Sequence, residues 1–180
     1  MTTTSDRADW LAWRSGAGTP DAPTLGATDC AVIACAALDW PSFRDPADLY
    51  DAHWSPKPDR GRFDEKSAIM QIGLELEPYV LGLYLARDGR TRAGEARLQL
   101  AAHPWLRCSI DELHLDDIGL TAEIVDAKTT RYLQRGAYFA GGDLDGAPVW
   151  PPAYLTQLAV YGVVTEQVHG VSPLLTLAVL

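Results

Sequence analysis

The sequence predicts an α/β or α+β fold in which helices flank a small central mixed sheet. Two observations support this prediction. Between residues 64 and 86, apolar residues recur every three or four positions, which is typical of one face of a helix. Between residues 97 and 130, the pattern changes to the alternation of β-strands, interrupted by turn residues. The 180 residues fit one domain, 1–180, that is long enough to bury a core.

The N-terminal part of the chain predicts helices joined by loops. Residues 5–14 (SDRADWLAWR) indicate a short amphipathic helix, and residues 15–27, rich in Gly, Pro, Ala and Thr, indicate a loop. Thr28 or Asp29 is then expected to cap an apolar helix (CAVIACAAL), because both side chains accept hydrogen bonds from the free N–H groups of a helix start. Residues 45–53 predict a further helical turn or two.

The remaining elements alternate between helix and strand. A helix is predicted over residues 64–86, but Pro78 cannot donate a helical hydrogen bond, so we expect a kink or a new helix start near residues 75–77. Strands are predicted at residues 97–103, 106–115 and 120–130, with a DDIG turn between the last two. A helix after the two prolines at 151 and 152 and one or two closing strands complete the chain.

The charge of the chain limits the kind of nucleic-acid contact it can make. A net charge of −9 argues against a protein that coats nucleic acid, because such proteins bind phosphate through excess positive charge. An enzyme avoids this objection when its carboxylates surround cations and its basic residues form a local track. One stretch of the sequence offers such a track, with a solvated charged surface as the alternative: Arg60, Arg62, Lys66, Arg87, Arg90, Arg92 and Arg97.

Neither a membrane segment nor a disulfide framework is expected. No apolar run has the length that spans a bilayer, and the polar N-terminus lacks the pattern of a signal peptide, so a cytoplasmic protein is predicted. Cys30, Cys35 and Cys108 are odd in number and form no CxxC metal knuckle. We therefore expect buried free thiols.

Candidate catalytic residues gather between residues 111 and 128. Residues two apart in a strand share a face, so Asp126 and Lys128 point the same way. If the hairpin folds about residues 118 and 119, Asp111 lies opposite Asp126 to within about one residue of register. Opposed residues have Cβ atoms about 4.5–5.5 Å apart, so the two carboxylates repel each other unless a divalent cation lies between them.

Such a pair of carboxylates points to metal-dependent hydrolysis of a phosphodiester. Oxygen ligands favour Mg²⁺ or Mn²⁺ over zinc. Lys128, beside the ion, can position or polarise the attacking water and stabilise charge on the phosphate. The alternative is an exposed Asp-x-Lys strand face that forms a weak ion pair and has no catalytic role.

The order of motifs along the chain resembles the YqaJ-type viral recombinases, the phage lambda exonuclease family within the PD-(D/E)XK nuclease superfamily. The resemblance covers most of the chain, from about residue 10 to residue 164. Its motifs are Arg14 followed by GATD at 26–29, GLELEP at 73–78, SIDE at 109–112, DAK at 126–128 and YLTQ at 154–157. Ile110 and Glu112 depart from the family pattern, which has Pro and Gly at these positions.

The resemblance implies a restriction-endonuclease-like core with a metal-dependent active site. Glu77, Asp111 and Asp126 would ligate Mg²⁺ or Mn²⁺. Lys128 would help to activate water, and Gln157 would orient that water or contact the same network of side chains. The departures at positions 110 and 112 leave open a second hypothesis, in which the chain keeps the nuclease fold as a catalytically inactive module that binds DNA or protein.

The resemblance also implies a site for the end of a DNA strand. Arg14 and Thr28 would hold the 5′-phosphate, a role that suits a helix N-terminus because its free N–H groups attract anions. The alternative for Thr28 is that it only caps the helix. Glu75 and Glu123 are the weaker alternatives for the metal ligands on the helix and on the last strand of the hairpin.

The function implied by this family is exonuclease action on double-stranded DNA ends. It implies 5′-to-3′ resection in phage-type recombination, in a phage or prophage setting within the cytoplasm of a bacterial host. It further implies a ring-like homo-oligomer, commonly a trimer, and a single-strand annealing protein as partner. An endonuclease with the same metal site is the alternative activity.

Overall fold

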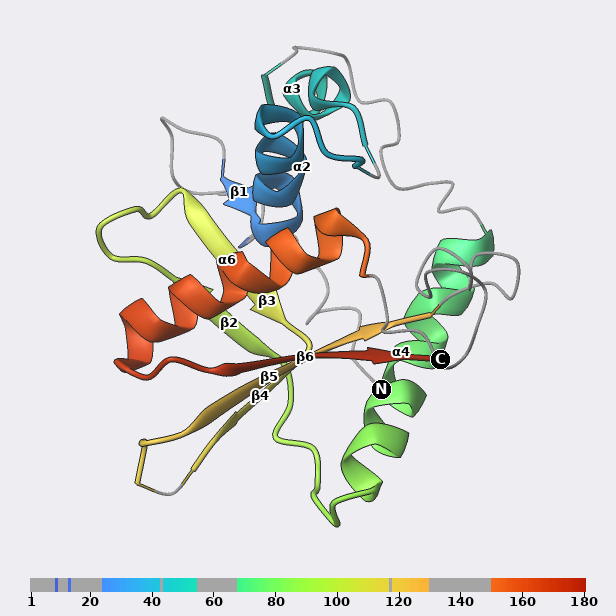
Figure 1. Cartoon of the computed structure of the whole chain (residues 1–180), viewed down its shortest axis with the longest axis vertical. Coiled ribbons are helices and arrows are strands. Elements are labelled where there is room, and N and C mark those ends of the chain that lie inside the picture. Colours follow the sequence, from blue (N-terminus) through green and yellow to red (C-terminus); the bar gives the residue numbers. More distant parts are fainter. Residues whose placement is uncertain are drawn as a thin grey trace.

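The computed structural model describes residues 24–42, 44–54, 68–116, 118–129 and 150–180, together with Asp9 and Trp13. In chain order the elements are β1 (Leu25–Gly26), α2 (Ala27–Ala37), α3 (Pro46–Trp54), α4 (Ala68–Ala86), β2 (Ala96–Gln99), β3 (Leu106–Ile110), β4 (Glu112–Leu115), β5 (Ala122–Lys128), α6 (Pro152–His169) and β6 (Leu174–Val179). Figure 1 shows this mixed α/β arrangement, which confirms the predicted class. Of the helix expected over residues 5–14, only Asp9 and Trp13 are described, and both are helical.

The strands form two three-stranded sheets rather than the single sheet expected. One sheet has the order β1-β3-β2 and the other the order β4-β5-β6. The single strand predicted over residues 106–115 is therefore wrong, since it is divided at Asp111 between the two sheets. The reason lies at Glu112, whose fully buried carboxylate accepts a hydrogen bond of 3.0 Å from Gly94 N. The alternation of side chains along residues 106–115 gives no indication of this contact with the segment before β2.

The hairpin of β4 and β5 has the register that the turn predicts. Glu112 pairs with Val125 and Leu113 with Ile124. The turn contains Gly119 at a φ of +66°, a conformation that glycine adopts without strain. Extending the pairing by one residue places Asp111 opposite Asp126, so the expected register is confirmed.

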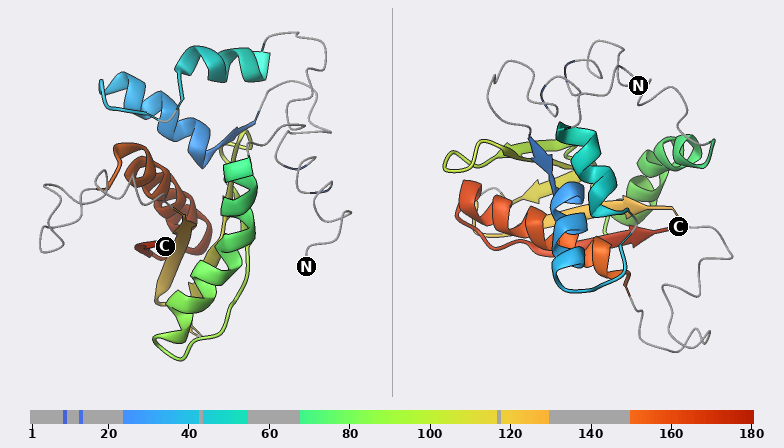
Figure 2. Two further views of the ribbon diagram at one scale, coloured as in Figure 1. Left: turned by 90° about the vertical axis from the view of Figure 1, so that its right-hand side faces the viewer. Right: turned by 90° about the horizontal axis from the view of Figure 1, so that it is seen from above.

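The two faces of β5 pack against different helices. Ile124 belongs to a buried cluster with Leu158 and Val164 of α6, whereas Val125 belongs to a second cluster with Leu81 of α4. The left view of Figure 2 shows β5 between these two helices. Because side chains alternate along a strand, Asp126 and Lys128 share the face of Ile124, toward α6.

Two predicted helix features differ from the structure. Helix α2 begins at Ala27 with Gly26 as its N-cap, because residues 25 and 26 pair with β3 before the helix starts. Thr28 and Asp29 are thus inside the first turn, and Asp29 accepts a hydrogen bond of 2.9 Å from Gly26 N. Helix α4 runs without a break through Pro78, so no new helix begins near residues 75–77.

The three cysteines are free, as the sequence predicts, but only two of them are buried. Cys35 and Cys108 are buried, whereas Cys30 is partly buried. None of the described helices combines the length and the apolar character needed to cross a membrane.

Leu81 is expected to be a major contributor to stability. It is fully buried against β5, so Leu81→Ala should lower the free energy of unfolding by about 2–5 kcal/mol. Leu83 on the same helix is 46% exposed, and Leu83→Ala should change stability far less. Urea unfolding of both variants checks this, and equal losses would contradict the assignment of this helix face.

Candidate active site

Asp111 and Asp126 form the centre of the candidate site, at the point where β3 gives way to β4. Asp111 Oδ2 accepts a hydrogen bond of 3.0 Å from Ala127 N, which joins it to the opposite strand. Asp126 is 1% exposed. Burial, followed by the charges of Asp126 and Glu77, raises the pKa of Asp111 to about 8. Burial also raises the pKa of Asp126. Two acids are therefore held close together where their ionised forms are disfavoured.

Lys128 provides the positive charge at this centre. Its Nζ lies 2.6 Å from Asp126 Oδ2 and 5.3 Å from the ring centroid of Tyr154 on α6. Burial lowers the pKa of Lys128, but the charges of Asp126 and Asp111 outweigh this effect and raise it. The ammonium group is thus charged at neutral pH. The other carboxylate oxygen, Asp126 Oδ1, is buried and has no hydrogen-bond partner within the described residues.

Glu77 approaches the same centre from α4. Burial raises its pKa, and the charges of Lys128 and then Asp126 act on it with opposite signs. Gly73, one helical turn earlier, allows the helix to approach the end of β5 closely, since a Cβ at this position would lie 3.2 Å from Thr129 Oγ1. The spacing of Gly73 and Glu77 therefore has a structural reason: the small residue brings the acid within electrostatic range of the aspartates.

The two alternative acids lie elsewhere. Glu75 is exposed on α4. Glu123 lies on the opposite face of β5 from Asp126 and accepts hydrogen bonds from Tyr84 Oη at 2.8 Å and Thr176 Oγ1 at 2.9 Å, together with an ion pair to Arg90. The carboxylate of Glu123 is thus bound by these three side chains, on the face of β5 opposite Asp126.

The donor set at this centre suits a hard divalent cation. The available ligands are carboxylate oxygens, and the unpartnered buried oxygen of Asp126 needs a positive group. In the described parts of the chain, no three His, Cys, Asp or Glu side chains stand close enough together to hold a metal ion as they lie. Asp111 and Asp126 are accordingly the two acids that the fold brings opposite each other, with Glu77 beside them.

Gln157 reaches this centre through Tyr161, a residue that the sequence analysis missed. Gln157 is 6% exposed, and its Nε2 donates a hydrogen bond of 2.8 Å to Tyr161 Oη. Burial, and then the charges of Asp126 and Asp111, raise the pKa of Tyr161 well above its usual value. Because Tyr161 lies one helical turn after Gln157 on α6, the helical spacing was a signal that could have identified it.

A small cavity beside the start of α2 includes Thr28, one of the two residues predicted to bind the DNA end. It is lined by Trp13, Gly26, Ala27, Thr28, Arg107, Ser109 and Tyr161. Thr28 therefore faces a cavity instead of capping the helix, while Arg14 lies outside the described residues. Tyr161 lines this cavity, and the charges of Asp126 and Asp111 raise its pKa. The cavity and the acid centre therefore adjoin.

Arg107 makes this cavity a place for an anion. It is 7% exposed, donates a hydrogen bond to the backbone oxygen of Trp13, and stacks 5.5 Å from the Trp13 ring centroid. Its buried Nε has no hydrogen-bond partner in the described chain. A buried cation next to a helix N-terminus is a favourable setting for phosphate. The sequence signal for this role of Arg107 was a charged residue within a mostly apolar strand (LRCSI).

The basic track expected between residues 60 and 97 is largely neutralised where it is described. Arg90 pairs with Glu123 and Asp88, and Arg97 pairs with Glu95 at 3.2 Å. Arg87 is exposed, and Arg92 contacts the buried Glu112. The first three members of the track (Arg60, Arg62 and Lys66) lie outside the described residues.

Comparison with known proteins gives a family and a fold. The family model described as a YqaJ-like viral recombinase domain matches residues 9–168. Among solved structures, an alkaline exonuclease from Laribacter hongkongensis is similar, with a TM-score of 0.58 and 19% sequence identity over 89% of this chain and 69% of that chain. A comparison with curated proteins gives no match. The predicted resemblance and the predicted fold class are thus confirmed.

Proposed function

The chain belongs to the YqaJ-like viral recombinase family, and on this basis we propose that it is a Mg²⁺-dependent exonuclease that hydrolyses double-stranded DNA from its ends. The observation that carries the proposal is the pairing of the buried Asp126 with the partly buried Asp111 across a hairpin, with the Lys128 ammonium 2.6 Å from Asp126. This arrangement costs stability unless a cation joins the acids, so it favours a functional role over a structural one.

The residues of the centre have distinct roles in this proposal. Asp111 and Asp126 would hold Mg²⁺, or Mn²⁺ in its place, and Glu77 would complete the ligand set by turning toward the ion. When bound, the ion supplies Lewis acidity for the phosphoryl oxygen and for the attacking water. Lys128 orients that water and donates hydrogen bonds to the charge that develops on the phosphate. Gln157 fixes the hydroxyl of Tyr161, which borders the reacting phosphate.

The adjoining cavity favours action at DNA ends over cleavage within a strand. Thr28 and Arg107 bind the terminal 5′-phosphate, with Arg14 as a further ligand by family analogy. Because Tyr161 belongs to both sites, one DNA strand can occupy the cavity with its end and the acid centre with a phosphodiester a short distance along. This supports 5′-to-3′ resection. A phage setting, a ring-like trimer and a single-strand annealing partner complete the proposal by analogy with the family.

Nuclease activity is tested on three matched DNA substrates: linear duplex with 5′-phosphates, the same duplex with 5′-hydroxyls, and closed circular duplex. We expect Mg²⁺-dependent loss of the phosphorylated linear substrate and no loss of the circle. Cleavage of the circle would instead identify an endonuclease. If none of the three is degraded with Mg²⁺ or Mn²⁺, the chain is an inactive module with a nuclease fold.

Arg107→Gln is expected to remove the preference for a 5′-phosphate. A hydrogen bond to a charged group contributes about 1.5–3 kcal/mol, so kcat/KM on the phosphorylated duplex should fall roughly 10- to 100-fold. The rate on 5′-hydroxyl ends should change little, and Arg107→Lys should retain part of the preference. An equal fall on both substrates would mean that Arg107 only supports the fold.

A further inference from the structure

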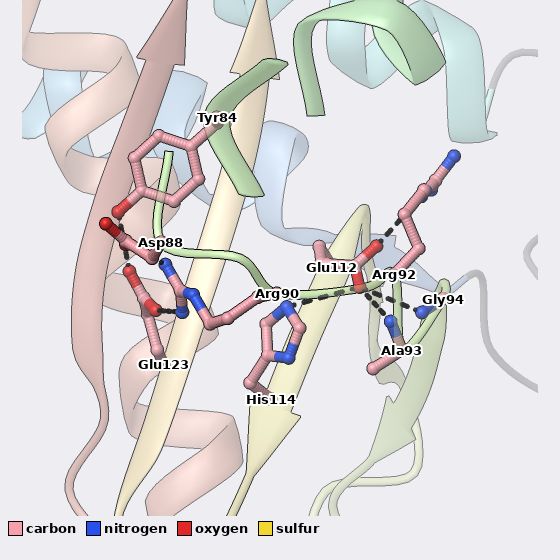
Figure 3. Close-up of polar contacts among 9 residues, drawn as sticks. All are labelled: Tyr84, Asp88, Arg90, Arg92, Ala93, Gly94, Glu112, His114 and Glu123. Atoms are coloured by element: carbon pink, nitrogen blue, oxygen red, sulfur yellow. Dashed lines mark hydrogen bonds and ion pairs between the residues drawn. The ribbon is translucent and has the colours of Figure 1, made fainter. Parts of the chain in front are cut away.

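The loop between α4 and β2, residues 87–95, is fastened to the β4–β5 hairpin by two carboxylates (Figure 3). Glu123 of β5 binds Arg90 near the start of the loop. Glu112 of β4 accepts hydrogen bonds from Arg92 Nε at 3.1 Å, from Gly94 N at 3.0 Å and from Ala93 N. Two of the three arginines of the loop are thus each held by a different strand of the hairpin that contains the candidate active site.

Glu112 is an unusual residue for its position. It is fully buried, and it follows Asp111 directly, so its backbone is part of the candidate site. A buried carboxylate is costly unless it is hydrogen-bonded, and here three donors from the loop satisfy it. One consequence is that the side chain of Arg92 is held in place through its Nε alone.

The rest of the Arg92 guanidinium is available to a ligand. Its side chain is 40% exposed, and no hydrogen bond from its two terminal nitrogens is made to any described residue. Figure 3 shows the end of this side chain directed away from Glu112 and from the hairpin. A guanidinium has five N–H donors in a rigid fork, so an Arg92 fixed at Nε presents the remaining donors in one orientation.

Arg92 also lies beside the acid centre. Its charge is among those that lower the pKa of Glu77, against the larger effect of burial. Arg90 differs in this respect, because Glu123 and Asp88 both pair with it and its charge acts on the opposite face of β5. Of Arg90 and Arg92, the two arginines held by carboxylates of the hairpin, Arg92 is thus the one that has unused N–H donors next to the candidate catalytic acids.

We propose that Arg92 binds a backbone phosphate of the DNA strand next to the bond that is cleaved, and that Glu112 is the residue that positions Arg92 for this contact. The inference rests on the proposed nuclease function and extends it to a specific substrate contact. The ligand is a phosphodiester, whose two non-bridging oxygens match the planar fork of a guanidinium. With a net charge of −9, the chain needs such local contacts to hold DNA.

The test compares two arginines of one loop. Binding of a fluorescent linear duplex is measured by anisotropy in Ca²⁺, which replaces Mg²⁺ to prevent cleavage, across about 50 to 300 mM salt. Arg92→Gln should weaken binding about tenfold and reduce the slope of log K against log salt by about one, the signature of one lost phosphate contact. Arg90→Gln removes the same charge from the same loop and should leave the slope unchanged.

The positioning role of Glu112 is tested by a double-mutant cycle. Glu112→Gln keeps the size of the side chain but removes the charge that holds Arg92 Nε. Arg92 is then present but less well positioned, so this variant should weaken binding, though less than Arg92→Gln does. The double variant should bind no more weakly than Arg92→Gln alone, because the two residues act through one contact. Arg92→Lys keeps the charge and serves as the second variant should Arg92→Gln unfold. It should keep the salt slope but lose part of the affinity.

The outcomes separate the inference from the proposed function. If the wild-type chain neither binds nor cleaves DNA, both are overturned. If it does so normally, but Arg92→Gln matches the wild type or matches Arg90→Gln in affinity and slope, the inference alone is overturned. Additive losses for the Glu112 and Arg92 variants would overturn the positioning role of Glu112.

Discussion

Lys128→Ala should lower kcat for Mg²⁺-dependent hydrolysis of linear duplex DNA by about 10²–10³-fold, the usual loss when a group that stabilises developing charge is removed. The ammonium lies on the same face of β5 as Asp126, at 2.6 Å from its carboxylate, and its pKa is raised so that it stays charged. KM should change far less than kcat, because the interaction strengthens as negative charge accumulates on the phosphate. Steady-state kinetics on a phosphorylated duplex measure both quantities.

Two controls separate catalysis from folding in this experiment. Lys128→Met retains most of the side-chain volume without the charge and should show the same loss of kcat. Arg87→Ala removes an exposed positive charge from the nearby loop and should leave kcat nearly unchanged. A folded Lys128→Ala variant with rates near those of the wild type would exclude a catalytic role for this amine.

Asp111→Asn should abolish nuclease activity and yet raise the melting temperature of the metal-free protein at about pH 8. In the folded chain the pKa of Asp111 is raised to about 8 from its ordinary value of 3.8. Between these values the folded state binds more protons than the unfolded state, so stability is full below about pH 4 and falls as the pH rises to about 8. Asparagine removes the buried charge and can still accept the hydrogen bond from Ala127 N.

Thermal unfolding in EDTA and in Mg²⁺, across about pH 5 to 9, measures this effect. For a domain of this size, about 1 kcal/mol of relieved repulsion shifts Tm by about 2–4 °C. Mg²⁺ should raise the Tm of the wild type at high pH and leave Asp111→Asn unchanged. Asp116, in the turn of the same hairpin, provides a control of opposite sign. Desolvation raises the pKa of Asp116, but the hydrogen bonds from Thr121 and Leu120 together outweigh it and lower the pKa, so Asp116→Asn should lower Tm at neutral pH.

The acid centre could be predicted from the sequence because its geometry is mostly local. The turn at residues 118 and 119 fixes the pairing of Asp111 with Asp126, and strand alternation fixes the direction of Lys128. The distance from Glu77 to this hairpin is not local. That residue was recognised only through the family motif, and its approach depends on the packing of α4 against β5 at Gly73.

The features that the sequence did not predict depend on contacts between distant segments. The division of the sheet at Asp111 follows from the burial of Glu112 under the loop before β2, in which Gly94 lies 18 residues earlier in the sequence. The cavity requires the start of α2, the middle of β3 and a residue of α6 to meet. Local patterns could single out Arg107 and Tyr161, but they could not show that the two residues line one cavity. The cap of α2 was misplaced because the two-residue strand before it pairs with β3.

A crystal soaked in Mn²⁺ tests the central claim most directly, because the anomalous signal of manganese locates the ion independently of any assay. The proposal predicts one strong peak between the carboxylates of Asp111 and Asp126, within coordination distance of about 2.0–2.3 Å of an oxygen from each, with Glu77 turned toward the ion. No peak at this position in a crystal of the intact protein, or a peak held by other residues, would contradict the metal-dependent nuclease mechanism.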